Sequence, residues 1–160
     1  MTNNIIIFFA SYLYLFVVLG ILLAWLQTRK NLRLQFVVAT VLAGVIALIL
    51  SRIANKLYYD PRPFVTEHVK PLIAHVADNG FPSDHALLTM TLTAITYLYN
   101  RKVAAAMLVL TIVVGGSRIL ARVHSPLDIG TGWVIGIVGA VAGYYIAQYF
   151  WAKQKPKTQQ

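Results

Sequence analysis

The sequence contains no cysteine and few charged residues. Cysteine is absent from all 160 positions, which excludes a disulfide framework, a thiolate metal site and a cysteine nucleophile. Charged residues make up only 12% of the chain and hydrophobic residues 58%, a composition too apolar for an ordinary soluble domain. Because the chain is also short, we expect one membrane-embedded bundle rather than several domains.

Acidic residues are especially scarce. Five of them stand against 14 lysines and arginines, which gives a formal net charge of +9. Such an excess can indicate nucleic-acid binding, but the basic residues here lie in short groups between apolar runs. We therefore attribute them to lipid headgroups and membrane topology, and we expect no nucleic-acid partner.

Apolar runs divide the chain into membrane-spanning candidates, since about 20 apolar residues cross the hydrocarbon core as a helix. The runs cover residues 5–26, 34–53, 84–99, 103–120 and 126–151. The first is longer than a signal peptide needs and has no basic segment before it, so we interpret it as a retained helix. The third is short and rich in threonine, so we expect its neighbours to shield it from lipid.

These runs predict an all-α integral membrane bundle of about five transmembrane helices. It forms a single catalytic domain over residues 1–152, followed by a basic tail over residues 153–160. The segment between the second and third runs, residues 54–83, contains four prolines and should be irregular.

Small residues recur every four positions in the last run. One series is Gly132, Gly136 and Ala140, and the other is Gly139, Gly143 and Ala147. Small residues at this spacing let helices approach closely in lipid. Packing within the chain is the favoured interpretation, with a homodimer as the alternative.

The distribution of charge predicts the orientation. Five spans place the chain ends on opposite sides, and the positive-inside rule then favours an outer N-terminus and a cytoplasmic C-terminus. With that orientation the following basic residues are cytoplasmic: Arg29, Lys30, Arg33, Arg101, Lys102, Lys153, Lys155 and Lys157.

The same orientation gathers all acids and histidines on the outer side. They are Asp60, Glu67, Asp78, Asp84 and Asp128, with His68, His75, His85 and His124. One explanation is a single extracytoplasmic active site. The alternative is that acids merely avoid the cytoplasmic loops.

A polar stretch, SRILARVHSPLD, separates the last two apolar runs and holds Ser117, Arg118, His124 and Asp128. Each has an ordinary interpretation: Asp128 could complete a capping box with Ser125, and Arg118 could reach the headgroups. Together they suggest chemistry, because a carboxylate orients a histidine ring and arginine provides paired donors for phosphate oxygens.

Two further clusters precede it. Ser83, Asp84 and His85 lie at the predicted start of the third helix, where free backbone N–H groups favour an anion. Lys56 and Arg62 belong to the proline-stiffened segment KLYYDPRP. Capping explains Ser83 equally well alone, and headgroup anchoring explains Lys56 and Arg62.

The three clusters, in this order, resemble the signature of the type 2 phosphatidic acid phosphatase superfamily. The chain is most similar to its bacitracin-resistance type of undecaprenyl pyrophosphate phosphatase. Two positions depart from the pattern: Asn55 occupies the usual lysine slot, with Lys56 one residue later, and Asp84 replaces a glycine. The Asp84 carboxylate would repel phosphate unless it pairs with a nearby Arg or Lys.

The resemblance implies a haloperoxidase-like fold and a role for each motif residue. His124 would attack the terminal phosphorus to form a phosphohistidine, Asp128 would orient its ring, and His85 would protonate the departing lipid phosphate. The phosphate-binding residues would be Lys56, Arg62, Ser83, Asp84 through its amide, and Arg118, with support from Ser117 and Asn55. No metal or other cofactor is expected, because cationic side chains can stabilise the phosphoryl charge.

The implied function is hydrolysis of undecaprenyl pyrophosphate in the bacterial plasma membrane, which recycles the lipid carrier of cell-wall peptidoglycan synthesis. Phosphatidylglycerol phosphate, phosphatidic acid or diacylglycerol pyrophosphate would suit the same chemistry. A non-enzymatic lipid-binding or transport protein is the alternative from another class. It is disfavoured because the charges cluster at one face, while no buried acid or base is expected within the first, third or fifth apolar runs to mark a translocation path.

Overall fold

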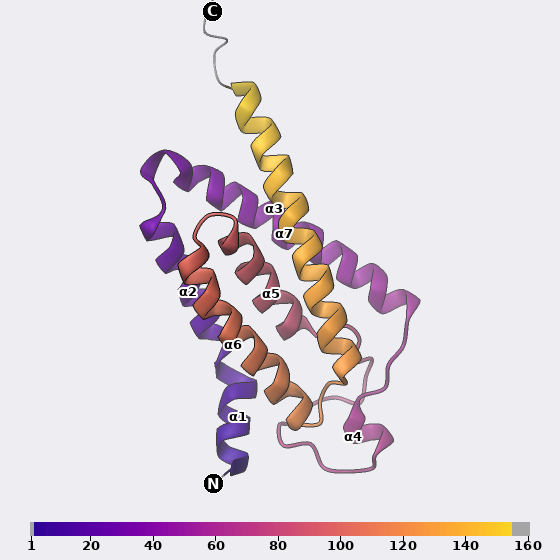
Figure 1. Cartoon of the computed structure of the whole chain (residues 1–160). Helices are drawn as coiled ribbons and strands as arrows, with labels where there is room; N and C mark the ends of the chain where they lie inside the picture. The colour runs from indigo at the N-terminus through magenta and orange to yellow at the C-terminus, as the bar shows by residue number, and fades with distance from the viewer. Residues whose placement is uncertain (1, 155–160) are drawn as a thin grey trace, which may run out of the picture.

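The computed structural model describes residues 2–154, which form a bundle of helices and connecting turns (Figure 1). The remaining positions, including most of the predicted basic tail, lie outside the described residues. The elements are α1 (Thr2–Tyr12), α2 (Tyr14–Gln27), the 3-10 helix η1 (Lys30–Leu32), α3 (Arg33–Leu57), α4 (Pro63–Thr66), α5 (Asp84–Tyr97), α6 (Arg101–Leu120) and α7 (Pro126–Gln154). The expected all-α architecture is confirmed.

Three helical segments of the described chain are long and apolar enough to cross a membrane: Lys30–Leu57, Arg101–Leu120 and Pro126–Lys153. The first predicted span is instead two helices, α1 and α2, which bend by 43° at their junction and pass the same test as a pair. This makes up to four spans rather than five. With 14 residues, α5 is only about 21 Å long and does not qualify.

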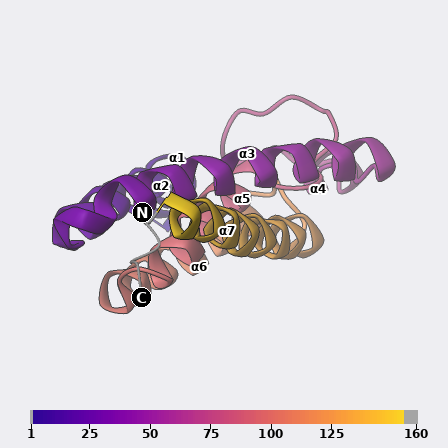
Figure 2. The ribbon, with the colours of Figure 1, turned by 90° about the horizontal axis from the view of Figure 1, so that it is seen from above.

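The short helix α5 lies inside the bundle. It packs against α2, α3, α6 and α7, and the view from above shows it between α3 and the pair α6 and α7 (Figure 2). All four of its threonines are buried, and three of their hydroxyls have partners within the bundle, as when Thr91 Oγ1 donates to the Leu87 carbonyl at 2.7 Å. Thr96 Oγ1 has no partner among the described residues. The predicted shielding of this helix is therefore confirmed.

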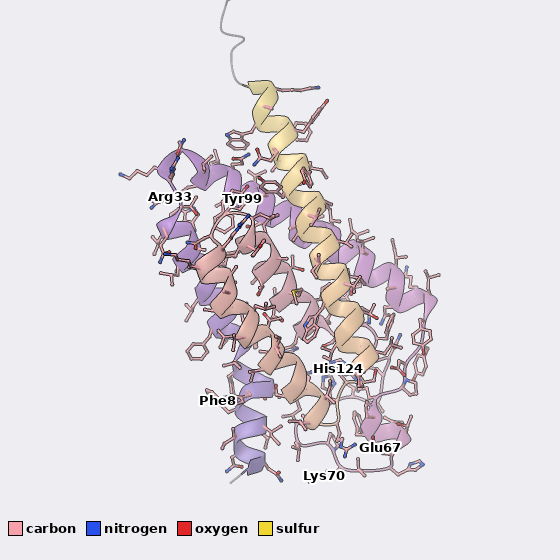
Figure 3. The ribbon with its side chains drawn as sticks, viewed as in Figure 1. Phe8, Arg33, Glu67, Lys70, Tyr99 and His124 are labelled. Atoms are coloured by element: carbon pink, nitrogen blue, oxygen red, sulfur yellow. The ribbon has the colours of Figure 1, made fainter. Side chains whose placement is uncertain are left out.

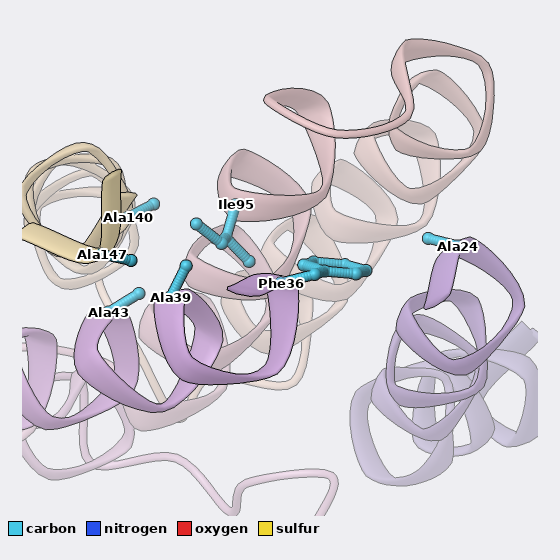
Figure 4. Packing of buried hydrophobic residues seen from close by; sticks show 7 residues of the cluster. All are labelled: Ala24, Phe36, Ala39, Ala43, Ile95, Ala140 and Ala147. Atoms are coloured by element: carbon cyan, nitrogen blue, oxygen red, sulfur yellow. The ribbon is translucent and has the colours of Figure 1, made fainter. Parts of the chain in front are cut away.

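The small residues of α7 pack against other helices of the same chain. A Cβ added at Gly143 would meet the backbone of Ala43 on α3, and one added at Gly136 would lie 2.9 Å from the Thr91 nitrogen on α5. Ala140 and Ala147 are fully buried in a cluster with α3 alanines (Figure 4). Both small-residue series thus serve close packing within the chain.

The two ends of the bundle differ in character. The start of α1, the end of α3, the segment 58–83 and the turn between α6 and α7 meet at one end (Figure 1). The opposite end holds η1, the turn between α5 and α6 and the end of α7, and it carries Arg29 in a cavity with Tyr99 and Trp151. Helix α1 begins at the first end and α7 ends at the second, because α5 also runs along the bundle although it is too short to qualify as a span (Figure 1).

The segment 54–83 is less irregular than predicted. Helix α3 continues to Leu57, one turn beyond the predicted end at residue 53, so Lys56 is helical. Pro63 opens α4, since proline is well suited to the first position of a helix. Other predicted boundaries are confirmed: Ser83 caps α5 by accepting from the Ala86 N–H, and α7 begins at Pro126 directly after Ser125.

Candidate active site

A buried histidine–aspartate pair occupies the turn between α6 and α7. His124 Nδ1 lies 3.2 Å from Asp128 Oδ2, and the two side chains are 4% and 1% exposed. Asp128 also completes the capping box: its Oδ2 accepts from the Ser125 N–H at 2.8 Å, and its own N–H donates to Ser125 Oγ at 3.2 Å. Helix capping and ring orientation are therefore performed by the same carboxylate.

The surroundings of His124 favour a neutral imidazole. Burial is the largest cause that lowers its pKa below the ordinary value, and the charges of Arg118 and Arg62 lower it further, while the hydrogen bond to Asp128 opposes them. Because Nδ1–H donates to Asp128, the lone pair of the neutral ring is on Nε2. His124 thus has the protonation state of a nucleophile.

Two buried arginines face the Nε2 atom of His124. Arg62 Nη1 and Arg118 Nη2 each lie 3.4 Å from it. Backbone carbonyls fix both guanidinium groups, since Arg62 Nη1 donates to Val123 O at 2.8 Å and Arg118 Nη1 donates to Ala10 O at 3.2 Å. The donors are therefore already placed where a phosphoryl group attacked by Nε2 would be.

A cavity of about 510 Å³ opens beside this cluster. It lies at the end of the bundle where Figure 3 labels His124, Glu67 and Lys70, opposite Arg33 and Tyr99. Most of its lining residues are polar or charged: Ser51, Arg52, Asn55, Arg62, His75, Asp78, Asn79, Gly80, Pro82, Asp84, His85, Arg118 and His124. The second predicted catalytic histidine, His85, thus shares one cavity with the first.

Three predicted residues take positions at which their side chains do not meet the phosphate site. Lys56 lines a separate open groove on the outer side of α3. The Ser117 hydroxyl donates to Val114 O at 2.7 Å within α6, and Ser83 is a buried cap whose backbone N–H donates to Asp128 O. Ser83 and Ser117 therefore hold the helix ends around the site.

The lysine slot of the first motif is filled by Asn55 in the structure. Its Nδ2 donates to Phe81 O at 2.6 Å, which ties the end of α3 to the turn before α5. Asn79 Nδ2 in turn donates to Asn55 O at 3.0 Å. The side chain of Asn55 lines the cavity and stabilises its wall, whereas Lys56 points elsewhere because it lies one residue further around the helix.

The carboxylate of Asp84 lies near Arg52, a residue that the motifs do not include. Asp84 Oδ1 is 4.0 Å from Arg52 Nη2, and both side chains line the cavity. The expected basic neighbour of Asp84 is therefore present. It comes from α3, 32 positions earlier in the chain, so the local sequence gives no signal for it.

The segment between α4 and α5 contributes two more residues that the motifs do not include. His75 Nε2 lies 3.1 Å from Arg118 Nη2, and burial as the main cause lowers the pKa of His75 to about 4, so the ring is neutral and accepts this bond. Asp78 Oδ1 accepts from Arg62 Nε at 2.7 Å, and this bond holds the Asp78 pKa below its usual range. Only the gathering of acids and histidines on one side pointed to them.

The described residues include no group of three or more histidines and carboxylates that could hold a metal ion. The cations that face the cavity are arginine side chains, which need no bound ion to stabilise phosphoryl oxygens. Catalysis without a metal remains a prediction.

Comparison with known proteins agrees with this geometry. The model of the PAP2 superfamily matches residues 32–152. The chain belongs to the PAP2 superfamily. It is 39% identical to a Bacillus licheniformis protein named bacitracin transport permease protein BcrC, over 92% of this chain and 72% of the relative. It is 30% identical to a Bacillus subtilis protein named undecaprenyl-diphosphatase BcrC, over 85% of this chain and 70% of the relative.

Solved structures share the fold. Aquifex aeolicus LpxE superposes with a TM-score of 0.64 at 20% sequence identity, covering 89% of this chain and 93% of its own. A PAP2-type phosphatidylglycerolphosphate phosphatase from Bacillus subtilis gives the same TM-score at 17% identity, covering 98% and 79%. Family, fold and spans together identify this PAP2 chain as a multi-pass membrane lipid phosphatase.

Proposed function

We propose that the chain hydrolyses undecaprenyl pyrophosphate to undecaprenyl phosphate and inorganic phosphate. The observation that carries this proposal is the neutral His124, whose Nε2 faces the donors of two buried arginines at a cavity in a membrane bundle. Phosphoryl transfer requires in-line positioning and stabilisation of spread negative charge, and these groups supply both.

In the first step, His124 Nε2 attacks the terminal phosphorus. An N–P bond forms while the bond from phosphorus to the bridging oxygen breaks, so the lipid monophosphate leaves and a phosphohistidine remains. Arg62 and Arg118 would hold the nonbridging oxygens, and Asp128 would stabilise the positive charge that develops on the ring. His85, which lines the same cavity, would give its proton to the departing oxygen. Burial lowers the His85 pKa to about 4 in the empty site, so this step requires the negative charge of the bound diphosphate to raise that pKa.

In the second step, water attacks the phosphohistidine. His85, deprotonated by the first step, takes a proton from this water, the P–N bond breaks, and orthophosphate leaves with His124 neutral again. His85 thus loses one proton to the lipid phosphate in the first step and regains one from water in the second. No metal ion takes part in this scheme.

The substrate class follows from the site's placement in a membrane protein. A polar cavity at one end of a membrane bundle can receive a headgroup while the attached chain stays in lipid. The BcrC relative named undecaprenyl-diphosphatase favours a prenyl pyrophosphate over the glycerolipid phosphates, which would suit the same groups. The positive-inside rule would place this end on the outer side of a bacterial plasma membrane, where the released carrier serves peptidoglycan synthesis.

Transport is the second candidate, because another relative is named a transport permease. Among the described residues, the buried ionisable groups are Arg62, Arg118, His124 and Asp128, all at one end of the bundle. A path for a polar substrate would need such groups along the bundle. This distribution favours the enzyme.

The proposal is tested by phosphate release from undecaprenyl pyrophosphate by purified protein in EDTA. We expect turnover with chelator present and its loss in His124→Ala. A radiolabelled terminal phosphate should appear transiently on the wild-type protein as an acid-labile adduct. Wild-type turnover by His124→Ala would overturn the nucleophile assignment, and loss of all activity on chelation would overturn metal-independent catalysis.

A further inference from the structure

An arginine outside the three motifs lies at the mouth of the cavity. Arg52 lies on α3, three residues before Asn55, and residues at this spacing share one face of a helix. Both line the cavity, whereas Lys56 does not. Arg52 therefore brings a third guanidinium group to a cavity that already contains those of Arg62 and Arg118.

The three arginines lie at different depths. Arg62 and Arg118 are 6% and 4% exposed and adjoin the equally buried His124. The side chain of Arg52 is 64% exposed, next to Asp84 at 65%. The deep end therefore suits the phosphoryl group attacked by His124, and a second phosphate on the same substrate would lie nearer the mouth.

Arg52 also borders an apolar groove. The groove, about 300 Å³ in volume, is formed by Leu48, Ile49, Ile53 and the stems of Arg52 and Lys56 on the outer side of α3. Ile49 and Ile53 are about half exposed, on a helix that qualifies as a membrane span. A lipid with its phosphates in the cavity and its chain along this groove passes directly over Arg52.

We infer that Arg52 binds the lipid-proximal phosphate of a diphosphate substrate and so selects diphosphate over monophosphate lipids. This inference rests on the proposed hydrolysis and adds a specificity residue to it. The guanidinium donates two parallel N–H bonds to nonbridging oxygens, a geometry that lysine does not reproduce. The Asp84 carboxylate lies 4.0 Å from this guanidinium at the cavity mouth, where a phosphate can displace it.

A matched pair of substrates isolates this role. Farnesyl diphosphate and farnesyl phosphate carry the same chain and differ by the lipid-proximal phosphate alone. We expect Arg52→Ala to lower kcat/KM for the diphosphate by about 10- to 100-fold, the range of one charge-assisted pair, and to change the monophosphate rate by less than about threefold. Arg52→Lys should recover part of the loss, and Arg101→Ala, the same substitution at the opposite end of the bundle, should alter neither rate.

The outcomes separate this role from the alternatives. Retained monophosphate turnover in Arg52→Ala shows that the variant is folded and that the transferred phosphoryl group is still bound. An equal loss on both substrates, or an unchanged diphosphate rate, would overturn the role of Arg52 and leave the proposed hydrolysis intact. If the wild-type protein releases phosphate from neither compound, both the role of Arg52 and the proposed hydrolysis are overturned.

Discussion

Replacement of Asp128 by asparagine separates the charge of this residue from its shape. In the structure one oxygen, Oδ2, accepts both the His124 Nδ1–H and the Ser125 backbone N–H. Oδ1 is buried and has no partner among residues 2–154. The backbone N–H of Ser125 can only donate, so in Asp128→Asn it should select the amide oxygen, rather than the amide nitrogen, for the Oδ2 position. That oxygen can still accept from His124 Nδ1–H, so His124 keeps its proton on Nδ1 and its lone pair on Nε2.

The magnitude follows from this orientation. Hydrogen bonds to charged groups contribute about 1.5–3 kcal/mol and neutral ones about 0.5–1.5, so loss of the charge should cost about 1–2 kcal/mol. At about 1.4 kcal/mol per factor of ten, kcat should fall about 5- to 30-fold. If the Asn amide were flipped, its NH₂ group would donate to His124 Nδ1, and the ring proton would then be on Nε2, which could not attack phosphorus. The corresponding change of tautomer in a serine-protease triad lowers the rate about 10⁴-fold.

The assay is single-turnover phosphate release by Asp128→Asn in detergent, with thermal unfolding as the check on folding. Ser125→Ala is the control for the helix cap, because it keeps the backbone N–H and removes the hydroxyl, which accepts from the Asp128 N–H and donates to Asp60 Oδ2. It should lose about 1 kcal/mol of stability with nearly wild-type turnover. A loss near 10⁴-fold in folded Asp128→Asn would refute the argument that the cap orients the amide, and an unchanged rate would refute the role of the charge.

Three other predictions follow from the fold and the site. Gly143→Ala should destabilise the bundle by about 1–3 kcal/mol in thermal unfolding, whereas Gly44→Ala, with open space at the new methyl, should be neutral or stabilising. Only the neutral His124 ring attacks, so kcat/KM should fall when the pH drops through the His124 pKa, which lies below the ordinary value near 6.5. A pH profile in which kcat/KM already falls above pH 6.5 would contradict this. In this cysteine-free chain, a cysteine at Lys70 should react with an impermeant reagent from outside intact cells and one at Lys102 should not; the reverse pattern would invert the orientation.

The spans were predictable because length and hydropathy are local properties. The bend between α1 and α2 was not, since residues 12–14 read Tyr-Leu-Tyr without proline or glycine. The status of α5 also depends on its neighbours: its composition resembles a weak membrane helix, and only the surrounding helices bury its polar threonines.

The histidine–aspartate pair was predictable for the same reason. His124 and Asp128 are four residues apart across a capped helix start, so local geometry alone brings them together. The Lys56 side chain lies outside the cavity because α3 stays helical to Leu57 and Lys56 follows Asn55 by one residue around that helix. The tertiary fold brings three further residues to the site, His75, Asp78 and Arg52. Their spacing along the chain does not predict this.

The carboxylates around the cavity explain how three arginines are tolerated before substrate binds. Asp78 pairs with Arg62, and Asp84 lies near Arg52, so the resting site contains less uncompensated positive charge than its arginines alone would give. The two carboxylates are 56% and 65% exposed and can turn into water at small cost, whereas Arg62 is buried and fixed by a carbonyl. A phosphate should therefore displace the carboxylates and leave the buried Arg62 and Arg118 in place. Substrate affinity then reflects an exchange of anions at guanidinium groups that are already positioned, and the aspartate in the glycine slot becomes compatible with a phosphate site.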